Sequence, residues 1–258
     1  PDGCYMVPLA GLETPEEVAP AIADALGFSF YGRSRLEEQL LDYLRPKEML
    51  LLLDNLEHLL PASDLLAEIL RLAPRVLLLV TSRERLNLRE EWVYEVGGLE
   101  NESAMALFAD RARRVRRTFS LDDEAAEAAR ICRMVEGVPL AVELAAAGAA
   151  VSSCAETVAA LSASLTALST TLSNIPARQR SIAATLDHSW RLLTDREQQA
   201  LARLSVLRGR FDIQAAEHVA GTAPDVLATL ARKSLLQEEA AGHFRLHALI
   251  QQFAAEHL

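Results

Sequence analysis

Buried apolar runs alternate with amphipathic segments through the first hundred residues. The runs are too short to span a membrane and lack the polar alternation of a half-buried strand, which indicates strands buried on both faces. The predicted strands cover residues 4 to 9, 49 to 53, 76 to 81 and 92 to 96, and the predicted helices begin at Thr14 and Ser34 and cover residues 63 to 72. This alternation predicts a parallel sheet covered by helices on both faces.

Capping boxes predict where two of these helices begin. Thr14 is followed three residues later by Glu17, and Ser34 is followed three residues later by Glu37. In a capping box the hydroxyl accepts from the backbone of the first turn, and the glutamate accepts from the N–H of the capping residue. The second helix is expected to end near Leu44.

After Gly97 and Gly98 the pattern changes to helices alone. Predicted helices cover residues 102 to 117, 123 to 135, 139 to 149, part of 152 to 176, 181 to 193, 194 to 205, 212 to 220 and 224 to 233, before strands at 235 to 238 and 243 to 247 and a terminal helix. Three helices leading into a hairpin are typical of a winged helix. The predicted fold class is therefore α/β plus all-α, with an α/β domain at 1–100, a helical domain at 101–180 and a winged-helix domain at 181–258.

Composition narrows the class of protein. The chain has 258 residues, half of them hydrophobic, and a formal net charge of −10. That charge argues against binding nucleic acid or an anionic membrane by charge alone. The three cysteines, Cys4, Cys132 and Cys154, lack metal-ligand spacing and are expected to be reduced thiols of a cytoplasmic protein. No membrane-spanning run or signal peptide is evident, and a start at Pro1 in place of Met suggests a fragment.

The run Leu50 to Leu53 ends in Asp54 and Asn55, which puts a carboxylate at the carboxyl end of a buried strand. In open α/β sheets ligands bind at that edge. Asp is also a common helix N-cap, so the run by itself favours neither a ligand site nor a cap.

Four segments in order resemble the signal-transduction ATPases with numerous domains, the STAND class, and in particular the predicted-ATPase module of bacterial transcriptional regulators. The segments are LLLLDNLEHLL, VLLLVTSRERLNL, EGVPLAVELAAA and ATLDHSWRLLTDREQQALARLSVLRGRFDIQAAE. The resemblance covers nearly the whole chain. It implies a P-loop NTPase-like sheet and an ADP/ATP-dependent regulatory switch of the NB-ARC-like type, with Mg²⁺ in the full-length protein.

The resemblance assigns roles in the first domain. Asp54 matches the Walker B aspartate that holds Mg²⁺, which favours the site over the cap. Asn55 stands where hydrolysing enzymes often have an acid and cannot act as a general base, and Glu57 is poorly placed to replace it. Arg83 matches the sensor arginine, whose planar fork suits the terminal phosphate. A solvent-exposed strand-end arginine is the alternative.

Two further matches lie in the later domains. Gly137 and Pro139 match the turn that packs against adenine, although any turn between helices uses Gly and Pro in this way. His247 matches the winged-helix histidine that contacts the β-phosphate of ADP. The family's next residue is Asp, and Ala248 stands there in this chain. A partly buried structural histidine is the alternative reading.

A phosphate-binding loop, the Walker A motif, is missing. The nearest string is GFSFYGRS, residues 27 to 34, but a helix precedes it, aromatic residues crowd it, and Ser34 is better explained as an N-cap. The resemblance puts the true loop and its strand upstream of residue 1, with that strand pairing beside residues 76 to 81.

The leading interpretation is a switch module that binds ADP or ATP, self-associates on activation and works with sensor and effector domains elsewhere in the full-length protein. Whether it is an enzyme stays open, since the chain is not expected to hydrolyse ATP alone. The first alternative is a DNA-binding winged helix, whose recognition helix offers only Arg232 and Lys233 as cations, so direct DNA contact is not expected. The second alternative is an ATPase that turns over in the full-length protein.

Overall fold

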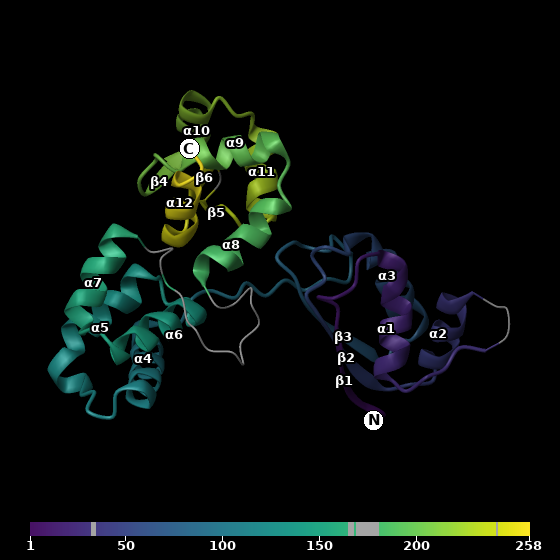
Figure 1. Cartoon of the computed structure of the whole chain (residues 1–258). Helices are drawn as coiled ribbons and strands as arrows, with labels where there is room; N and C mark the ends of the chain where they lie inside the picture. The colour runs from purple at the N-terminus through teal and green to yellow at the C-terminus, as the bar shows by residue number, and fades with distance from the viewer. Residues whose placement is uncertain (32–34, 165–167, 169–180, 241) are drawn as a thin grey trace. The chain divides into compact units, whose positions relative to one another are not determined.

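In the computed structural model, the described residues are 1–31, 35–164, 168, 181–240 and 242–258 (Figure 1). They divide into two compact units, Pro1–Tyr94 and Glu95–Leu258. No helix in these ranges is both long enough and apolar enough to cross a bilayer.

Unit 1 contains a three-stranded parallel sheet. The strands are β1 (Gly3–Pro8), β2 (Met49–Asp54) and β3 (Val76–Thr81), in the order β1-β2-β3. The register pairs Pro8 with Asp54 and Asp54 with Thr81, so all three carboxyl ends lie at one edge. The three strands predicted up to residue 81, and their parallel arrangement, are confirmed.

Helices cover one face of this sheet. They are α1 (Val18–Ala25), α2 (Leu36–Leu44) and α3 (Ser63–Leu72), with short 3-10 helices η1 (Pro15–Glu17) and η2 (Leu60–Ala62). Apolar side chains from the three helices, such as Ile22, Leu40 and Leu66, pack with Leu51 and Leu53 of β2 in one buried cluster. Within each helix the buried apolar residues recur about one turn apart, so that one apolar stripe faces the sheet.

The opposite face of the sheet is bare, so the prediction of helices on both faces is wrong for the described residues. Met6 of β1 is 59% exposed, and Leu77 and Leu79 of β3 are 65% and 52% exposed. These side chains alternate with the buried ones along each strand, as the two-residue period of a strand requires. We call Cys4, Met6, Leu50, Leu52, Leu77 and Leu79 the bare face.

The predicted strand at 92 to 96 is wrong as well. None of these residues is in a strand, and the side chain of Trp92 is 97% exposed. A strand forms only when its backbone groups find a partner strand, and neither edge of the described sheet supplies one for this segment. The segment therefore has the alternating apolar pattern of a strand, but the described residues contain no strand for it to pair with.

The predicted helix starts hold in part. Glu17 accepts from the backbone N–H of Thr14 at 2.9 Å, and Thr14 caps the first helical turn. Ser34 lies outside the described residues; helix α2 begins at Leu36, with Arg35 in the capping position and no side-chain cap. Helix α3 spans the predicted residues.

Unit 2 begins with a helical part that packs around Phe108, Ile131 and Val142. Its helices are α4 (Asn101–Val115), α5 (Leu121–Met134), α6 (Pro139–Ala147), η3 (Gly148–Ala150) and α7 (Cys154–Ala163). The predicted helices are confirmed within two residues at most ends.

The C-terminal part of unit 2 packs a second apolar cluster, which includes Leu204, Leu227 and Phe244. Its elements are α8 (Ile182–Arg191), α9 (Asp195–Leu204), β4 (Arg210–Asp212), α10 (Ile213–Ala220), α11 (Pro224–Arg232), β5 (Gln237–Ala240), β6 (His243–Arg245) and α12 (Ala248–Ala255). The strands form an antiparallel sheet in the order β4-β6-β5. Strand β4 was not predicted. The three-domain division and the winged helix stay predictions.

Candidate functional site

Asp54 lies half-buried at the carboxyl end of β2, opposite Thr81 of β3. The Thr81 hydroxyl donates to Asp54 Oδ1 at 2.8 Å and accepts from the backbone N–H of Asn55 at 2.9 Å. Asp54 is thus fixed by its strand neighbour and does not cap the following turn. Thr81 was missed as a site residue, although the register of two parallel strands that end together could have predicted it.

Asn55 is held by its own set of bonds. Its backbone has a left-handed φ of 72°, a region that asparagine tolerates better than most residues. Its side-chain nitrogen lies 3.2 Å from His58 Nδ1, and His58 Nε2 lies 3.1 Å from the carbonyl oxygen of Leu12. Because that carbonyl can only accept, Nε2 carries the proton and Nδ1 accepts from the Asn55 amide. The sequence reasoning did not identify His58.

Arg83 forms an ion pair with Glu57, the next acidic residue after Asp54 in the chain. Arg83 Nε lies 3.4 Å from Oε1 of Glu57, whose side chain is only 6% exposed. A buried carboxylate needs such a partner, since leaving it unpaired would cost several kcal/mol on the order-of-magnitude scale for buried charges. Arg83 lies at the same edge as Asp54 but is directed to Glu57.

The donor set at Asp54 fits a Mg²⁺ ion that keeps most of its water. Among the described residues no three His, Cys, Asp or Glu side chains gather as a metal cage. Mg²⁺ is commonly held by one or two protein oxygens, with waters and phosphate oxygens filling the other positions. Asp54, together with the Thr81 hydroxyl, offers oxygen ligands of that kind.

Gly137 lies in a crowded turn before α6, where Pro139 takes the first helical position. Its φ is +66°, and its carbonyl accepts from the N–H of Leu99 at 2.8 Å. A Cβ at Gly137 would lie 2.2 Å from the Leu99 carbonyl oxygen, and a Cβ at Gly98 would lie 2.0 Å from the carbonyl oxygen of Glu136. Backbone packing alone therefore requires glycine at 137.

His247 caps the last helix and faces a glutamate from the helical part. Its Nδ1 accepts from the N–H of Leu249 at 3.2 Å, and its Nε2 lies 3.3 Å from Oε2 of Glu136. Burial, the largest effect, lowers the pKa of His247 below its ordinary 6.5; the Glu136 carboxylate opposes that shift and Arg245 adds to it. The imidazole is therefore neutral at pH 7.

Glu136 and Arg245 are the residues at this place that sequence reasoning missed. Glu136 has a left-handed φ of 50°, which is rare for a glutamate and costs on the order of 1–3 kcal/mol. No sequence signal marks it, because neither the backbone strain nor a contact over 111 positions leaves a local pattern. Its only distinguishing feature in the sequence is its position directly before Gly137.

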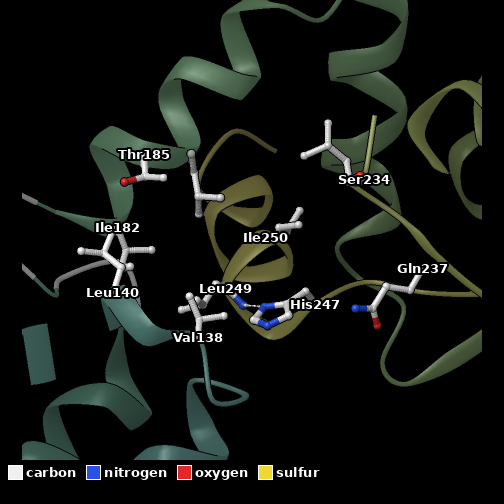
Figure 2. A pocket seen from close by; sticks show the side chains of 11 residues that line it. Val138, Leu140, Ile182, Thr185, Ser234, Gln237, His247, Leu249 and Ile250 are labelled. Atoms are coloured by element: carbon white, nitrogen blue, oxygen red, sulfur yellow. Dashed lines mark hydrogen bonds between the residues drawn. The ribbon is translucent and has the colours of Figure 1, made fainter. Parts of the chain in front are cut away.

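A pocket of about 210 Å³ lies between the helical part and the C-terminal part of unit 2 (Figure 2). Val138 and Leu140, which flank Pro139, line it from the helical part, and His247 and Leu249 line it from the C-terminal part. Its other lining residues are Ile182, Thr185, Leu186, Ser234, Leu235, Gln237 and Ile250. The lining is mostly apolar with a few polar groups, which is typical of small-molecule sites.

The structure thus gathers the predicted site residues in two sets. Asp54, Asn55 and Arg83 lie at the carboxyl edge of the unit 1 sheet. In unit 2, His247 lines the pocket directly, while Gly137 and Pro139 shape the turn whose next residues line it.

The predicted recognition helix has little free positive charge. Lys233 Nζ lies 3.0 Å from Oε2 of Glu197 and donates to the carbonyl oxygen of Leu192 at 3.2 Å. Burial, the largest single effect, raises the pKa of Glu197, but the hydrogen bonds from Thr194 and the pairing with Lys233 together outweigh it and hold that pKa below its usual value. A lysine bound in this way contributes little to phosphate contacts.

Comparison with known proteins gives the fold. No protein-family model matches the chain. The Aeropyrum pernix ORC2 protein, solved as ADPNP–ADP complexes, superposes with a TM-score of 0.50 at 14% identity, over 98% of this chain and 78% of that one. The STAND protein PH0952 of Pyrococcus horikoshii, with a tetratricopeptide repeat sensor, gives a TM-score of 0.39 at 16% identity, over 99% of this chain and 37% of that one. The overall fold of the chain is therefore similar to that of the ORC2 protein.

Closer relatives give the family. The "Putative HTH-type transcriptional regulator Rv0890c" of Mycobacterium tuberculosis is 34% identical over 271 residues, and the chain spans only 31% of its length. The "Uncharacterized protein Rv0894" of the same organism is 33% identical over 265 residues, which cover 97% of this chain and 67% of that protein. The chain belongs to the same family as Rv0894.

Proposed function

We propose that the chain is the regulatory nucleotide-binding part of a STAND-type switch. In this proposal ADP holds the protein in a closed state, and exchange for ATP releases the C-terminal part and allows self-association. Such a switch needs different nucleotide affinities in its two states and does not need fast turnover. The single observation that carries the proposal is the pocket in unit 2.

That pocket is lined by residues from two predicted nucleotide-contacting segments that lie more than a hundred positions apart. Val138 and Leu140 offer apolar surface suited to a purine ring, and His247 offers an imidazole donor suited to phosphate. A chance cavity between helices has no reason to combine these two segments. The pocket therefore favours a nucleotide over an unrelated apolar ligand.

From the resemblance we propose Asp54 and Arg83 of unit 1 as Mg²⁺- and phosphate-binding residues. Asp54, with the Thr81 hydroxyl, would hold Mg²⁺ through oxygen ligands. Arg83 would leave Glu57 to reach a terminal phosphate, to which a guanidinium can donate two parallel bonds. These roles follow from the resemblance and from the carboxyl-edge position of both residues.

We place the phosphate-binding loop on a strand that precedes residue 1 and pairs with β3. The support is the unpaired edge of β3 and the bare face beside it, which exposes Met6, Leu77 and Leu79. A strand and the helix that follows it would satisfy that edge and cover that face. The segment at 92 to 96, apolar and without a partner strand, would gain a neighbour from the same addition.

Rapid ATP hydrolysis is not part of the proposal. The two side chains nearest in sequence that might activate water are engaged elsewhere: Asn55 with His58, and Glu57 with Arg83. A general base must be within hydrogen-bond reach of the attacking water and able to accept its proton. An amide cannot accept it, and Glu57 is held by a cation.

The regulatory context is proposed from the relatives. The longer relative Rv0890c is named a putative HTH-type transcriptional regulator. We propose that DNA binding belongs to a separate HTH segment of a longer cytoplasmic protein, that a sensor domain supplies the signal, and that this chain contacts neither DNA nor membrane. Lys233 is paired with Glu197 and so contributes little to phosphate contacts, which supports placing DNA binding in a separate segment.

Calorimetric titration of ADP with Mg²⁺ tests the proposal. Two chains are compared: the 258 residues alone, and a longer chain that carries the preceding residues. We expect binding in the longer chain and at least a hundredfold weaker binding in the shorter one, since the phosphate loop supplies most of the phosphate contacts. Asp54→Asn in the longer chain should weaken binding only when Mg²⁺ is present.

Asp64→Asn, the same charge change in the first turn of α3, is the matched control and should bind like the wild type. Absence of ADP binding in both chains would reject the switch. Equal micromolar binding in both would leave nucleotide binding intact and reject the upstream phosphate loop.

A further inference from the structure

Glu136 joins the helical part of unit 2 to its C-terminal part. It stands in the turn between α5 and α6, with its backbone in the left-handed region. One carboxylate oxygen, Oε1, accepts from the N–H of Ala248 at 2.9 Å. The other, Oε2, lies 3.3 Å from His247 Nε2 and 3.6 Å from Arg245 Nη2. Glu136 therefore accepts one hydrogen bond from the C-terminal part and faces two of its basic side chains.

The tautomer of His247 places its proton on Nε2, the ring nitrogen that lies 3.3 Å from Oε2 of Glu136. The backbone N–H of Leu249 can only donate, so Nδ1 of His247 accepts from it and carries no proton. A neutral ring then carries its proton on Nε2, directed at Oε2 of Glu136. Burial, which lowers the pKa of His247, keeps the ring in this neutral form near pH 7.

The donors around Glu136 are those that bind a phosphate oxygen. They are a backbone N–H in the first turn of α12, an imidazole N–H and a guanidinium. Arg245 is also held by Glu239, whose Oε1 lies 3.0 Å from its Nε, and by Gln237, which accepts from its Nη2 at 3.0 Å. The guanidinium therefore has two partners besides Glu136.

Resting on the nucleotide site proposed above, we propose that Glu136 is an internal competitor of the nucleotide phosphate. Its carboxylate accepts from the N–H of Ala248 and lies 3.3 Å from Nε2 of His247, the group that a phosphate would contact. A phosphate that reaches His247 must displace it, because two anions cannot share one Nε2–H. Glu136 thereby sets the affinity for phosphate-bearing ligands and holds the two parts of unit 2 together until one arrives.

Ligand titrations with ADP and with adenosine separate this role from a purely structural one. In the longer chain described above, Glu136→Gln should bind ADP roughly five- to tenfold more tightly than the wild type, because the neutral amide is a weaker competitor than the carboxylate. Adenosine, which has no phosphate, should bind both proteins equally. Glu143→Gln is the matched control. It neutralises another glutamate of the helical part, one that pairs with Arg111, and it should leave the affinities for ADP and adenosine unchanged.

Equal ADP affinity in wild type and Glu136→Gln would overturn the competitor role, and so would an equal gain for adenosine. If no protein binds ADP, the nucleotide proposal fails, and the competitor role is then judged by NMR titration of His247. Loss of the carboxylate should lower the pKa of His247 further in Glu136→Gln, since that charge favours the protonated ring. An unchanged pKa would show that Glu136 does not hold His247 at all.

Discussion

The two units bury their apolar side chains to different extents. In unit 1, one face of the sheet is packed under three helices while Met6, Leu77 and Leu79 on the other face remain exposed. In unit 2, two apolar clusters are filled, and backbone segments approach so closely that Gly98 and Gly137 leave no room for a Cβ. The difference is that the described part of unit 1 leaves one face of its sheet exposed, whereas apolar clusters fill both described parts of unit 2.

The same substitution made in both units gives the largest expected contrast. Gly137→Ala combines a left-handed φ with a Cβ only 2.2 Å from the Leu99 carbonyl oxygen, whereas Gly27→Ala shares the left-handed φ of +65° but has open space around it. We expect a loss of about 2–6 kcal/mol in the free energy of unfolding at Gly137 and about 1 kcal/mol at Gly27. Urea unfolding followed by circular dichroism measures both, and equal losses would mean that the turn at Gly137 is not crowded.

Leucines on the two faces of the sheet provide the second contrast. Leu51→Ala empties a fully buried position and should cost about 2–5 kcal/mol, whereas Leu79→Ala on the bare face should change stability by no more than about 0.5 kcal/mol. Thermal and urea unfolding of the two variants test this. A large loss at Leu79 would show that the bare face is covered by something in the 258-residue chain itself.

Acid titration of stability probes unit 2 with a smaller effect. Because the folded-state pKa of His247 lies below its ordinary 6.5, the unfolded chain takes up a proton before the folded one does. Stability from this group is fully present above about pH 6.5 and falls as the pH drops from there toward the lowered value. His247→Gln should lack this fall, while both proteins lose stability together below pH 4.5, where the unfolded chain begins to protonate carboxylates, such as Glu197, whose pKa is lowered in the folded protein. An identical pH profile for the two proteins between pH 7 and 5 would contradict the burial of His247.

Thiol labelling gives the smallest perturbation. Cys4 is exposed on the bare face, whereas burial raises the pKa of Cys132 to about 11 and that of Cys154 to about 12. A thiol reagent at pH 7.5 should therefore modify Cys4 within minutes and the other two only on unfolding, as mass spectrometry of timed samples would show. In a longer chain whose added strand and helix cover the bare face, Cys4 should become slow to react; unchanged labelling would argue against that cover.

Local patterns predicted most of the fold. The capping glutamate Glu17, the buried run of β2 and the amphipathic stripe of α3 are each written in a few neighbouring residues, and each was found where expected. The predictions that were wrong concern contacts between segments distant in the chain. Among the residues that the structure describes, the segment at 92 to 96 has a strand's composition but no strand beside it, and the bare face has a core's composition but no helix over it.

The candidate site divides in the same way. The sequence pointed to Asp54 and His247 through strand-end position and motif, but not to the groups that hold them. Thr81 meets Asp54 through sheet register, and Glu136 meets His247 across 111 positions with a backbone conformation that glutamate rarely adopts. Contacts of that kind depend on tertiary packing, which no local periodicity encodes.

The crowding at Gly98 and Gly137 also bears on which sequences this fold can accept. At Gly137 both the left-handed backbone and the Leu99 carbonyl exclude a side chain, whereas at Gly98 the carbonyl oxygen of Glu136 alone excludes it. A library randomised at both positions and selected for folded protein should return glycine at each, even though 98 lies in what looks like an ordinary linker. Position 98 would then tolerate as little variation as a core position.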